Sequence, residues 1–166
     1  LINDIIKLSE LDDSDLKLEF ETVDLHELGE QCVSSMQMQA EKNEVTLQLE
    51  GTSVPMSGNK TLLEELLFNL CSNAVRYNKK GGSVTIVTAI ENTRPVLIVK
   101  DTGIGIPKEQ QERVFERFYR VDKSRSKSTG GTGLGLAIVK HIVAQHDAQI
   151  SMTSEVGVGT EIKVVF

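Results

Sequence analysis

The sequence lacks the segments that would mark a membrane-spanning or exported chain. No apolar run approaches the roughly 20 residues that cross a bilayer, and no signal peptide opens the sequence. The chain begins at Leu1 rather than at methionine, so we expect a piece of a longer protein, and these absences describe this piece only. With 166 residues, 39% hydrophobic and 25% charged, the composition predicts one domain with a sizeable core and a short appendage.

The sequence has only two cysteines, and its acidic residues outnumber its basic residues by 24 to 18. Cys32 and Cys71 lie in apolar helical patterns, without a Cys-x-x-Cys motif or a histidine at ligand spacing, so we expect two buried thiols in a reducing compartment. The net charge of −6 argues against a nucleic-acid partner. Residues 1–30 hold ten acids and two lysines, whereas residues 31–166 hold 14 acids and 16 bases. A slightly basic body suits a polyphosphate ligand, although so small a balance is weak support alone.

A helix predicted around residues 66–77 carries asparagines where a surface helix usually carries lysine and glutamate. At about 100° per residue, its polar strip holds Glu65, Asn69, Asn73 and Arg76. Two asparagines one turn apart cost helix stability, because asparagine is a poor helix former. An amide oxygen is a suitable ligand for a magnesium ion that water and phosphate already surround. Two solvated amides, or amides bonded to a neighbouring loop, are an equally good interpretation of this helix alone. The apolar face consists of Leu63, Leu66, Leu67, Leu70, Cys71, Ala74 and Val75.

Two glycine motifs follow, one after a predicted strand and one at the start of a predicted helix. The first reads Asp101-Thr102-Gly103-Ile104-Gly105-Ile106-Pro107. The Asp101 carboxylate can accept a hydrogen bond from the exocyclic amine of adenine, and its glycines let a base approach the backbone. The second reads Gly130-Gly131-Thr132-Gly133-Leu134-Gly135-Leu136. Free backbone N–H groups and the helix dipole favour a triphosphate there. Each motif alone is weak, because such turns also occur without a ligand.

The order of the motifs is more specific than any one of them. Asn-x-x-x-Asn, then Asp-x-Gly-x-Gly, then Gly-x-Gly-x-Gly resembles the ATP-binding catalytic domain of sensor histidine kinases. That domain belongs to the superfamily shared with DNA gyrase B, heat-shock chaperones and MutL, and the resemblance covers about residues 24–166. A P-loop is excluded because no Gly-Lys-Ser/Thr occurs. A Rossmann fold is excluded because these glycines follow a long polar loop near the C-terminus rather than a first strand.

The pattern of elements predicts an α+β fold, a two-layer sandwich with one mostly antiparallel mixed sheet and about three helices on one face. The resemblance implies the Bergerat ATP-binding fold with an ATP lid. Strands are expected in hairpins with helices between them, and Asp24 and Asn59 are expected as helix N-caps. We expect helices at 1–12, 25–42, 60–77, 108–119 and 132–146, and strands at 16–23, 45–50, within 51–58, and at 83–91, 95–101, 149–153 and 160–166.

The resemblance also implies roles for individual residues. Asp101 is the main reader of adenine, and Thr160 shares that contact. Asn73 is the magnesium ligand, with Asn69 beside it near the metal and phosphates. Asn69, Arg76 and Arg120 are the implied catalytic residues, with Arg120 contacting the γ-phosphate. The remaining nucleotide contacts are implied at Tyr77, Gly103, Gly105, Ile106, Gly131, Thr132, Gly133, Leu134, Gly135 and Leu136.

The same register predicts little intrinsic ATP hydrolysis. Gyrase and the heat-shock ATPases use an acid as general base on water. Glu65-x-x-x-Asn69 imitates that arrangement, but Ala74, Arg76 and Tyr77 fix the kinase register, so Asn69 takes the place of the acid. An amide cannot take a proton from water at neutral pH.

Residues 103–131 resemble the ATP lid. Within them, the run from Phe115 to Arg120 matches the kinase phenylalanine box. Phe115 and Phe118 are three residues apart, so they are expected on one helical face, where core anchoring and docking of missing helices are equally good explanations. In the polar loop that follows, solvated charge is the favoured explanation for Lys123, for Arg125 and for Lys127 taken singly.

The N-terminal segment has the pattern of a coiled-coil seam, with apolar residues at Leu1, Ile5, Leu8 and Leu11. A helix this short is not stable alone, so we expect it to pack on partner helices missing from this chain. The resemblance makes residues 1–15 the end of the dimerisation and phosphoacceptor helix with a hinge, and residues 16–166 the catalytic domain. A frayed amphipathic tail is the alternative.

The resemblance implies a kinase that binds Mg-ATP and donates the γ-phosphate to a histidine on the dimerisation domain. None of His26, His141 and His146 lies in an acceptor motif, so this chain alone is not expected to autophosphorylate. The implied partners are its own dimerisation helices and a response regulator. The resemblance implies that this domain is cytoplasmic and that the isolated chain is monomeric. It also implies that the full-length protein is a membrane-anchored homodimer. The alternatives are a regulatory nucleotide-binding module, a superfamily ATPase and an anti-sigma serine kinase.

Overall fold

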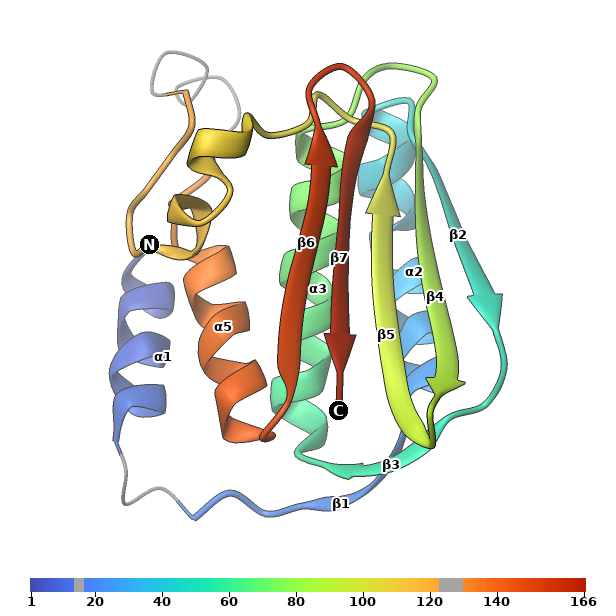
Figure 1. Cartoon of the computed structure of the whole chain (residues 1–166), viewed down its shortest axis with the longest axis vertical. Coiled ribbons are helices and arrows are strands. Elements are labelled where there is room, and N and C mark those ends of the chain that lie inside the picture. The colour runs from blue at the N-terminus through green and yellow to red at the C-terminus, as the bar shows by residue number, and fades with distance from the viewer. Residues whose placement is uncertain (14–16, 123–129) are drawn as a thin grey trace.

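The computed structural model describes residues 1–13, 17–122 and 130–166 (Figure 1). Its longer helices are α1 (Ile2–Asp12), α2 (Leu25–Lys42), α3 (Lys60–Arg76) and α5 (Gly135–Gln145). Its strands are β1 (Glu21–Asp24), β2 (Thr46–Gly51), β3 (Pro55–Gly58), β4 (Ser83–Glu91), β5 (Arg94–Asp101), β6 (Gln149–Glu155) and β7 (Gly159–Val165). No helix in these ranges is long and apolar enough to cross a membrane.

The main sheet has five strands in the order β2-β4-β5-β7-β6, and helices α2, α3 and α5 cover it (Figure 1). Only β2 and β4 pair in parallel, and the other pairs are antiparallel. The expected α+β sandwich is confirmed. The expectation of a single sheet is wrong, because β1 and β3 form a separate two-stranded sheet. Pro55 begins β3, and a proline suits such a short strand at an edge because it has no N–H to donate.

The core lies between the helices and the main sheet. Along β4, the residues buried toward the helices alternate with partly exposed ones, as a half-buried strand requires. Edge strand β6 alternates throughout, with Ile150, Met152 and Ser154 partly buried and Gln149, Ser151, Thr153 and Glu155 exposed. Both cysteines are free and buried, as predicted. A hydrogen bond that the Cys71 thiol donates to Cys32, together with burial, raises the pKa of Cys71, which keeps it protonated.

Both predicted N-caps are present, and each fixes the start of a helix. The Asp24 carboxylate accepts a hydrogen bond from the His26 N–H at 2.8 Å, and Asn59 Oδ1 accepts one from the Leu62 N–H at 3.0 Å. Asp24 Oδ1 also accepts from the Val54 N–H at 2.9 Å, which ties the start of α2 to the chain entering β3.

The prediction of a helix at residues 108–119 is wrong. Two 3-10 turns replace it, η1 (Lys108–Gln110) and η2 (Arg113–Phe115). A tertiary hydrogen bond explains the break, because the Phe118 N–H donates to the Gly133 carbonyl at 2.9 Å and Phe118 takes a positive φ of 64°. Phe115 and Phe118 therefore do not share a helical face, and Phe118 is 57% exposed.

Two boundaries also differ from expectation. Helix α5 begins at Gly135 rather than at Thr132, since Gly133 has a φ of 74° and cannot continue a helix. Strand β1 covers only the end of the strand expected at 16–23.

The N-terminal helix packs within this chain, although partner helices from outside the chain were expected. Helix α1 packs on α5 of the same chain, and Leu8 and Leu11 are buried there, whereas Leu1 and Ile5 stay exposed. Half of the predicted seam is thus satisfied within this chain.

Candidate functional site

One cavity of about 660 Å³ collects most of the predicted site residues. It lies between the polar strip of α3, the ends of β5 and β7, the η1–η2 segment and the start of α5. The predicted residues that line it are Asn69, Asn73, Arg76, Tyr77, Asp101, Gly105, Ile106, Arg120, Gly131, Thr132, Gly133, Gly135, Leu136 and Thr160. Two do not line it. Leu134 is fully buried in the core, and Gly103 contributes its backbone behind Asp101.

At one end of the cavity, Asp101 is held by backbone groups. It ends β5 and pairs with Thr160 of β7. Its Oδ1 accepts hydrogen bonds from the Gly103 N–H at 2.8 Å and the Thr160 N–H at 3.2 Å. Its Oδ2 has no partner among the described residues and remains available to an amine donor. Burial raises the pKa of this carboxyl, and the two backbone bonds oppose that shift.

Glycine is required beside this carboxylate. Gly105 has a φ of 71°, and a Cβ there would lie 2.1 Å from the Glu155 carbonyl oxygen. The adjacent Ile106 N–H donates to Ser154 Oγ at 2.8 Å, and Ser154 Oγ lies 2.8 Å from Thr160 Oγ1. A chain of short polar contacts therefore fixes the loop after β5 against the β6–β7 hairpin. We call this part, formed by Asp101, Gly105, Ser154 and Thr160, the base end.

At the other end, cationic groups converge on the glycine loop. A Cβ on Gly131 would meet Arg76 Nη1 at 3.0 Å, Arg120 Nη2 at 3.2 Å and the Tyr77 hydroxyl at 3.2 Å. Within residues 1–13, 17–122 and 130–166, neither guanidinium has an ion-pair or hydrogen-bond partner. Two unpaired cations at the start of helix α5 form an electropositive site suited to a polyphosphate.

The two asparagines of α3 face the same place. A Cβ on Gly135 would lie 3.5 Å from Asn69 Oδ1 and 3.8 Å from Asn73 Nδ2. The Asn69 side-chain nitrogen is buried and has no hydrogen-bond partner in the described part of the chain. A buried amide donor without a partner is costly, so it indicates a polar ligand in the cavity. We call Asn69, Asn73, Arg76, Arg120 and the 131–135 loop the phosphate end.

Sequence reasoning missed several cavity residues. Val99 and Ile162 lie on β5 and β7 and line the cavity as apolar walls, and the period-two pattern of those strands could have predicted them. Asp4 of α1 also lines the cavity, and no local signal pointed to it. Its position depends on the packing of α1 against α5.

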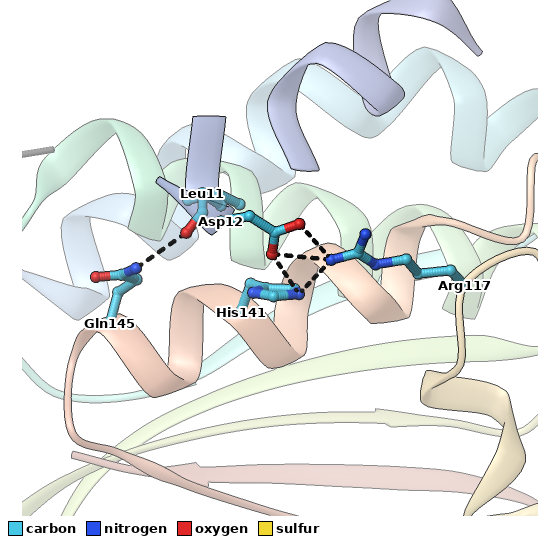
Figure 2. Close-up of polar contacts among 5 residues, drawn as sticks. All are labelled: Leu11, Asp12, Arg117, His141 and Gln145. Atoms are coloured by element: carbon cyan, nitrogen blue, oxygen red, sulfur yellow. Dashed lines mark hydrogen bonds and ion pairs between the residues drawn. The ribbon is translucent and has the colours of Figure 1, made fainter. Parts of the chain in front are cut away.

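Part of the phenylalanine box contacts α1 rather than the cavity. Arg117 bonds the carboxylate of Asp12, and both lie beside His141 of α5 (Figure 2). The predicted polar loop with Lys123, Arg125 and Lys127 lies outside the described residues.

Comparison with known proteins gives consistent matches. A family model described as histidine kinase-, DNA gyrase B- and HSP90-like ATPase matches residues 58–166. Sensor-like histidine kinase SenX3 of Mycolicibacterium smegmatis is 39% identical over 161 residues, which is 96% of this chain and 42% of that protein. The chain thus spans less than half the length of this curated relative.

Solved structures agree with that match. The mycobacterial sensor histidine kinase MprB has a TM-score of 0.77 at 27% identity, covering 89% of this chain and 97% of that one. Full-length ShkA, solved in complex with AMPPNP, has a TM-score of 0.86 at 26% identity, covering 99% of this chain and 34% of that one.

Proposed function

We propose that this chain, which belongs to the histidine kinase-, DNA gyrase B- and HSP90-like ATPase family, binds Mg-ATP and presents the γ-phosphate for transfer to a histidine. One observation carries the proposal. The cavity has a fixed carboxylate, Asp101, at its base end and two unpaired guanidinium groups, Arg76 and Arg120, at its phosphate end. The exocyclic amine of adenine can donate a hydrogen bond to Asp101, and the negative charge of a triphosphate can pair with Arg76 and Arg120.

A magnesium ion fits the polar strip of α3. We assign it to the amide oxygens of Asn73 and Asn69, completed by phosphate and water oxygens. The unpartnered Asn69 side-chain nitrogen is a hydrogen-bond donor, so it supports an acceptor such as a phosphate oxygen beside the ion. Among the described residues no group of three or more His, Cys, Asp or Glu could hold a metal ion. When bound, the ion would neutralise charge on the phosphates.

In this proposal the protein acts by positioning and by electrostatics. Asp101 fixes the base, and Arg76 and Arg120 stabilise charge on the transferring phosphoryl group. Asn69 stands where related ATPases have an acid, and it cannot activate water. We therefore expect slow ATP hydrolysis.

The acceptor histidine is proposed to lie outside this chain. His26 Nδ1 is 2.8 Å from Thr88 Oγ1, and His146 Nε2 accepts from the Asn59 N–H at 3.0 Å. His141 lies with Arg117. Each histidine thus has a structural partner, and none lines the cavity.

The wider arrangement follows from the resemblance to sensor kinases. We propose that residues 1–15 end a dimerisation helix and hinge, and that residues 16–166 form the catalytic domain. The domain would act on the cytoplasmic side of a membrane-anchored homodimer, with a response regulator as the downstream partner. The chain alone is expected to be monomeric.

Calorimetry tests the binding step. ATP should bind with about −8 to −5 kcal/mol, with an affinity or enthalpy that depends on magnesium, and Asp101→Asn should weaken binding about 10- to 100-fold. A folded sample that binds no adenine nucleotide would favour a regulatory module that has lost its ligand. Transfer is then tested with a longer form of the protein that carries the acceptor helices, by acid-labile labelling from γ-labelled ATP.

A further inference from the structure

We propose that helix α1, when docked on α5, competes with the nucleotide's phosphates, so that docked α1 and bound ATP oppose one another. The inference rests on the ATP site proposed above and adds a regulatory contact within the same chain. Its central residue is Asp4, which lies on α1 and lines the cavity.

One face of α1, from Asp4 to Asp12, contacts the rest of the domain, whereas Leu1 and Ile5 stay exposed. Leu8 and Leu11 are 4% and 7% exposed in the interface with the body. Lys7 Nζ forms an ion pair with Glu65 of α3, one turn before Asn69. These contacts fix both the rotation and the height of α1 against the body.

A polar clamp holds the C-terminal end of α1 (Figure 2). Arg117 Nη2 donates to both carboxylate oxygens of Asp12, at 2.8 and 2.6 Å. His141 Nε2 lies 3.5 Å from Asp12 Oδ1, and Gln145 Nε2 donates to the Leu11 carbonyl at 3.2 Å. The clamp joins α1 to both α5 and the segment after η2.

The opposite end of α1 reaches the phosphate end of the cavity. Thr132 Oγ1 donates a hydrogen bond to Asp4 Oδ2 at 3.0 Å. Thr132 follows Gly131, on which Arg76 and Arg120 converge. Docked α1 thus places a carboxylate in a site whose cations and free N–H groups suit phosphate.

Two consequences follow from this placement. The Asp4 carboxylate and a triphosphate are both anions, so each raises the electrostatic free energy of the other in a partly enclosed cavity. The Thr132 hydroxyl has one proton, so it can donate to Asp4 or to a phosphate oxygen, but not to both. Because coupling is reciprocal, docked α1 weakens ATP binding and bound ATP weakens α1 docking by the same factor.

The first test removes the charge of Asp4. In calorimetric titrations, Asp4→Asn should bind Mg-ATP about fivefold more tightly or better, the lower range of coupling between sites. Adenosine, which lacks phosphates, should bind wild type and variant equally. Glu10→Gln is the matched control, because it removes the same charge from an exposed position of α1 and should bind ATP like wild type.

The second test reads α1 directly. Saturating Mg-ATP should speed amide hydrogen exchange in residues 5–11 of the wild-type chain. Asp12→Asn, which weakens the clamp, should speed the same exchange without nucleotide and tighten ATP binding.

The outcomes separate the two proposals. If wild type does not bind ATP, or if Asp101→Asn binds it normally, the proposed function fails. If wild type binds ATP but Asp4→Asn matches Glu10→Gln or binds more weakly, only the competition is overturned. Unchanged or slower exchange in α1 on adding ATP overturns it too.

Discussion

The two ends of the cavity differ in how far they are organised without a ligand. At the base end, Asp101 Oδ1 is bonded to two backbone N–H groups, and Ser154 and Thr160 bond each other. At the phosphate end, Arg76, Arg120 and the Asn69 amide nitrogen have no protein partner in the described ranges. A site that is fixed in advance can select the base. A site with unsatisfied donors gains most of its free energy only when an anion fills it.

Removing the carboxylate at the base end should have the largest effect. In Asp101→Asn, the side-chain oxygen can still accept hydrogen bonds from the N–H groups of Gly103 and Thr160. The new NH2 group would then face the exocyclic amine of adenine, and two donors cannot form a hydrogen bond. ATP affinity should fall about 10- to 100-fold, the range for a hydrogen bond to a charged group. Calorimetry measures this, with exposed Asp147→Asn as the matched control. Equal loss in both variants would contradict a fixed base end.

Removing a cation at the phosphate end should weaken the binding of the triphosphate more than the binding of the base. Arg120→Ala should weaken the binding of ATP about tenfold, that of ADP less and that of adenosine not at all, because in the proposed complex only the phosphates would contact the guanidinium. Lys140→Ala removes a positive charge from an exposed position of α5 and serves as the control. If adenosine weakened as much as ATP, the two ends would not be separate.

The magnesium assignment predicts a smaller effect that depends on the ion. Asn73→Ala should weaken ATP binding about fivefold with magnesium present and have little effect in EDTA, because under this assignment the amide oxygen would contact the metal rather than the base. Isothermal titration with and without the ion measures the difference. Gln48→Ala, on the exposed side of β2, controls for loss of an amide. A loss of the same size in EDTA would exclude the metal role.

The smallest predicted effect is on stability. Burial raises the pKa of Asp101 above its ordinary value of 3.8, so the folded state favours the protonated form. Asp101 therefore contributes to the free energy of unfolding at acid pH, and this contribution is lost as the pH rises through the pKa of Asp101 in the folded state. At neutral pH, Asp101→Asn without ligand should melt at a temperature equal to wild type or up to about 3 °C higher. Its advantage should vanish near pH 3; a lower melting temperature at pH 7 would contradict the argument.

Site residues that belong to local sequence motifs were predictable, whereas residues placed by tertiary contacts were not. Asp101 and Asn73 were placed by residue type and motif order, because an acid after a strand and amides on a helix face are local features. The segment at 108–119 was not, since a hydrogen bond from Phe118 to Gly133 overrides its helical pattern. Asp4 was beyond reach for a similar reason, because its place depends on contacts such as Arg117 with Asp12, distant in sequence. Tertiary contacts of this kind leave no local pattern.

Edge strand β6 has a consequence for the handling of this domain as an isolated chain. Its outward residues are Gln149, Ser151, Thr153 and Glu155, so no apolar side chain lies on its exposed row. A second strand that paired with this edge would bury little apolar surface. The polar residues therefore disfavour the edge-to-edge pairing that begins aggregation. Replacing Ser151 and Thr153 with valine would create the apolar edge that the natural sequence avoids, without touching the cavity.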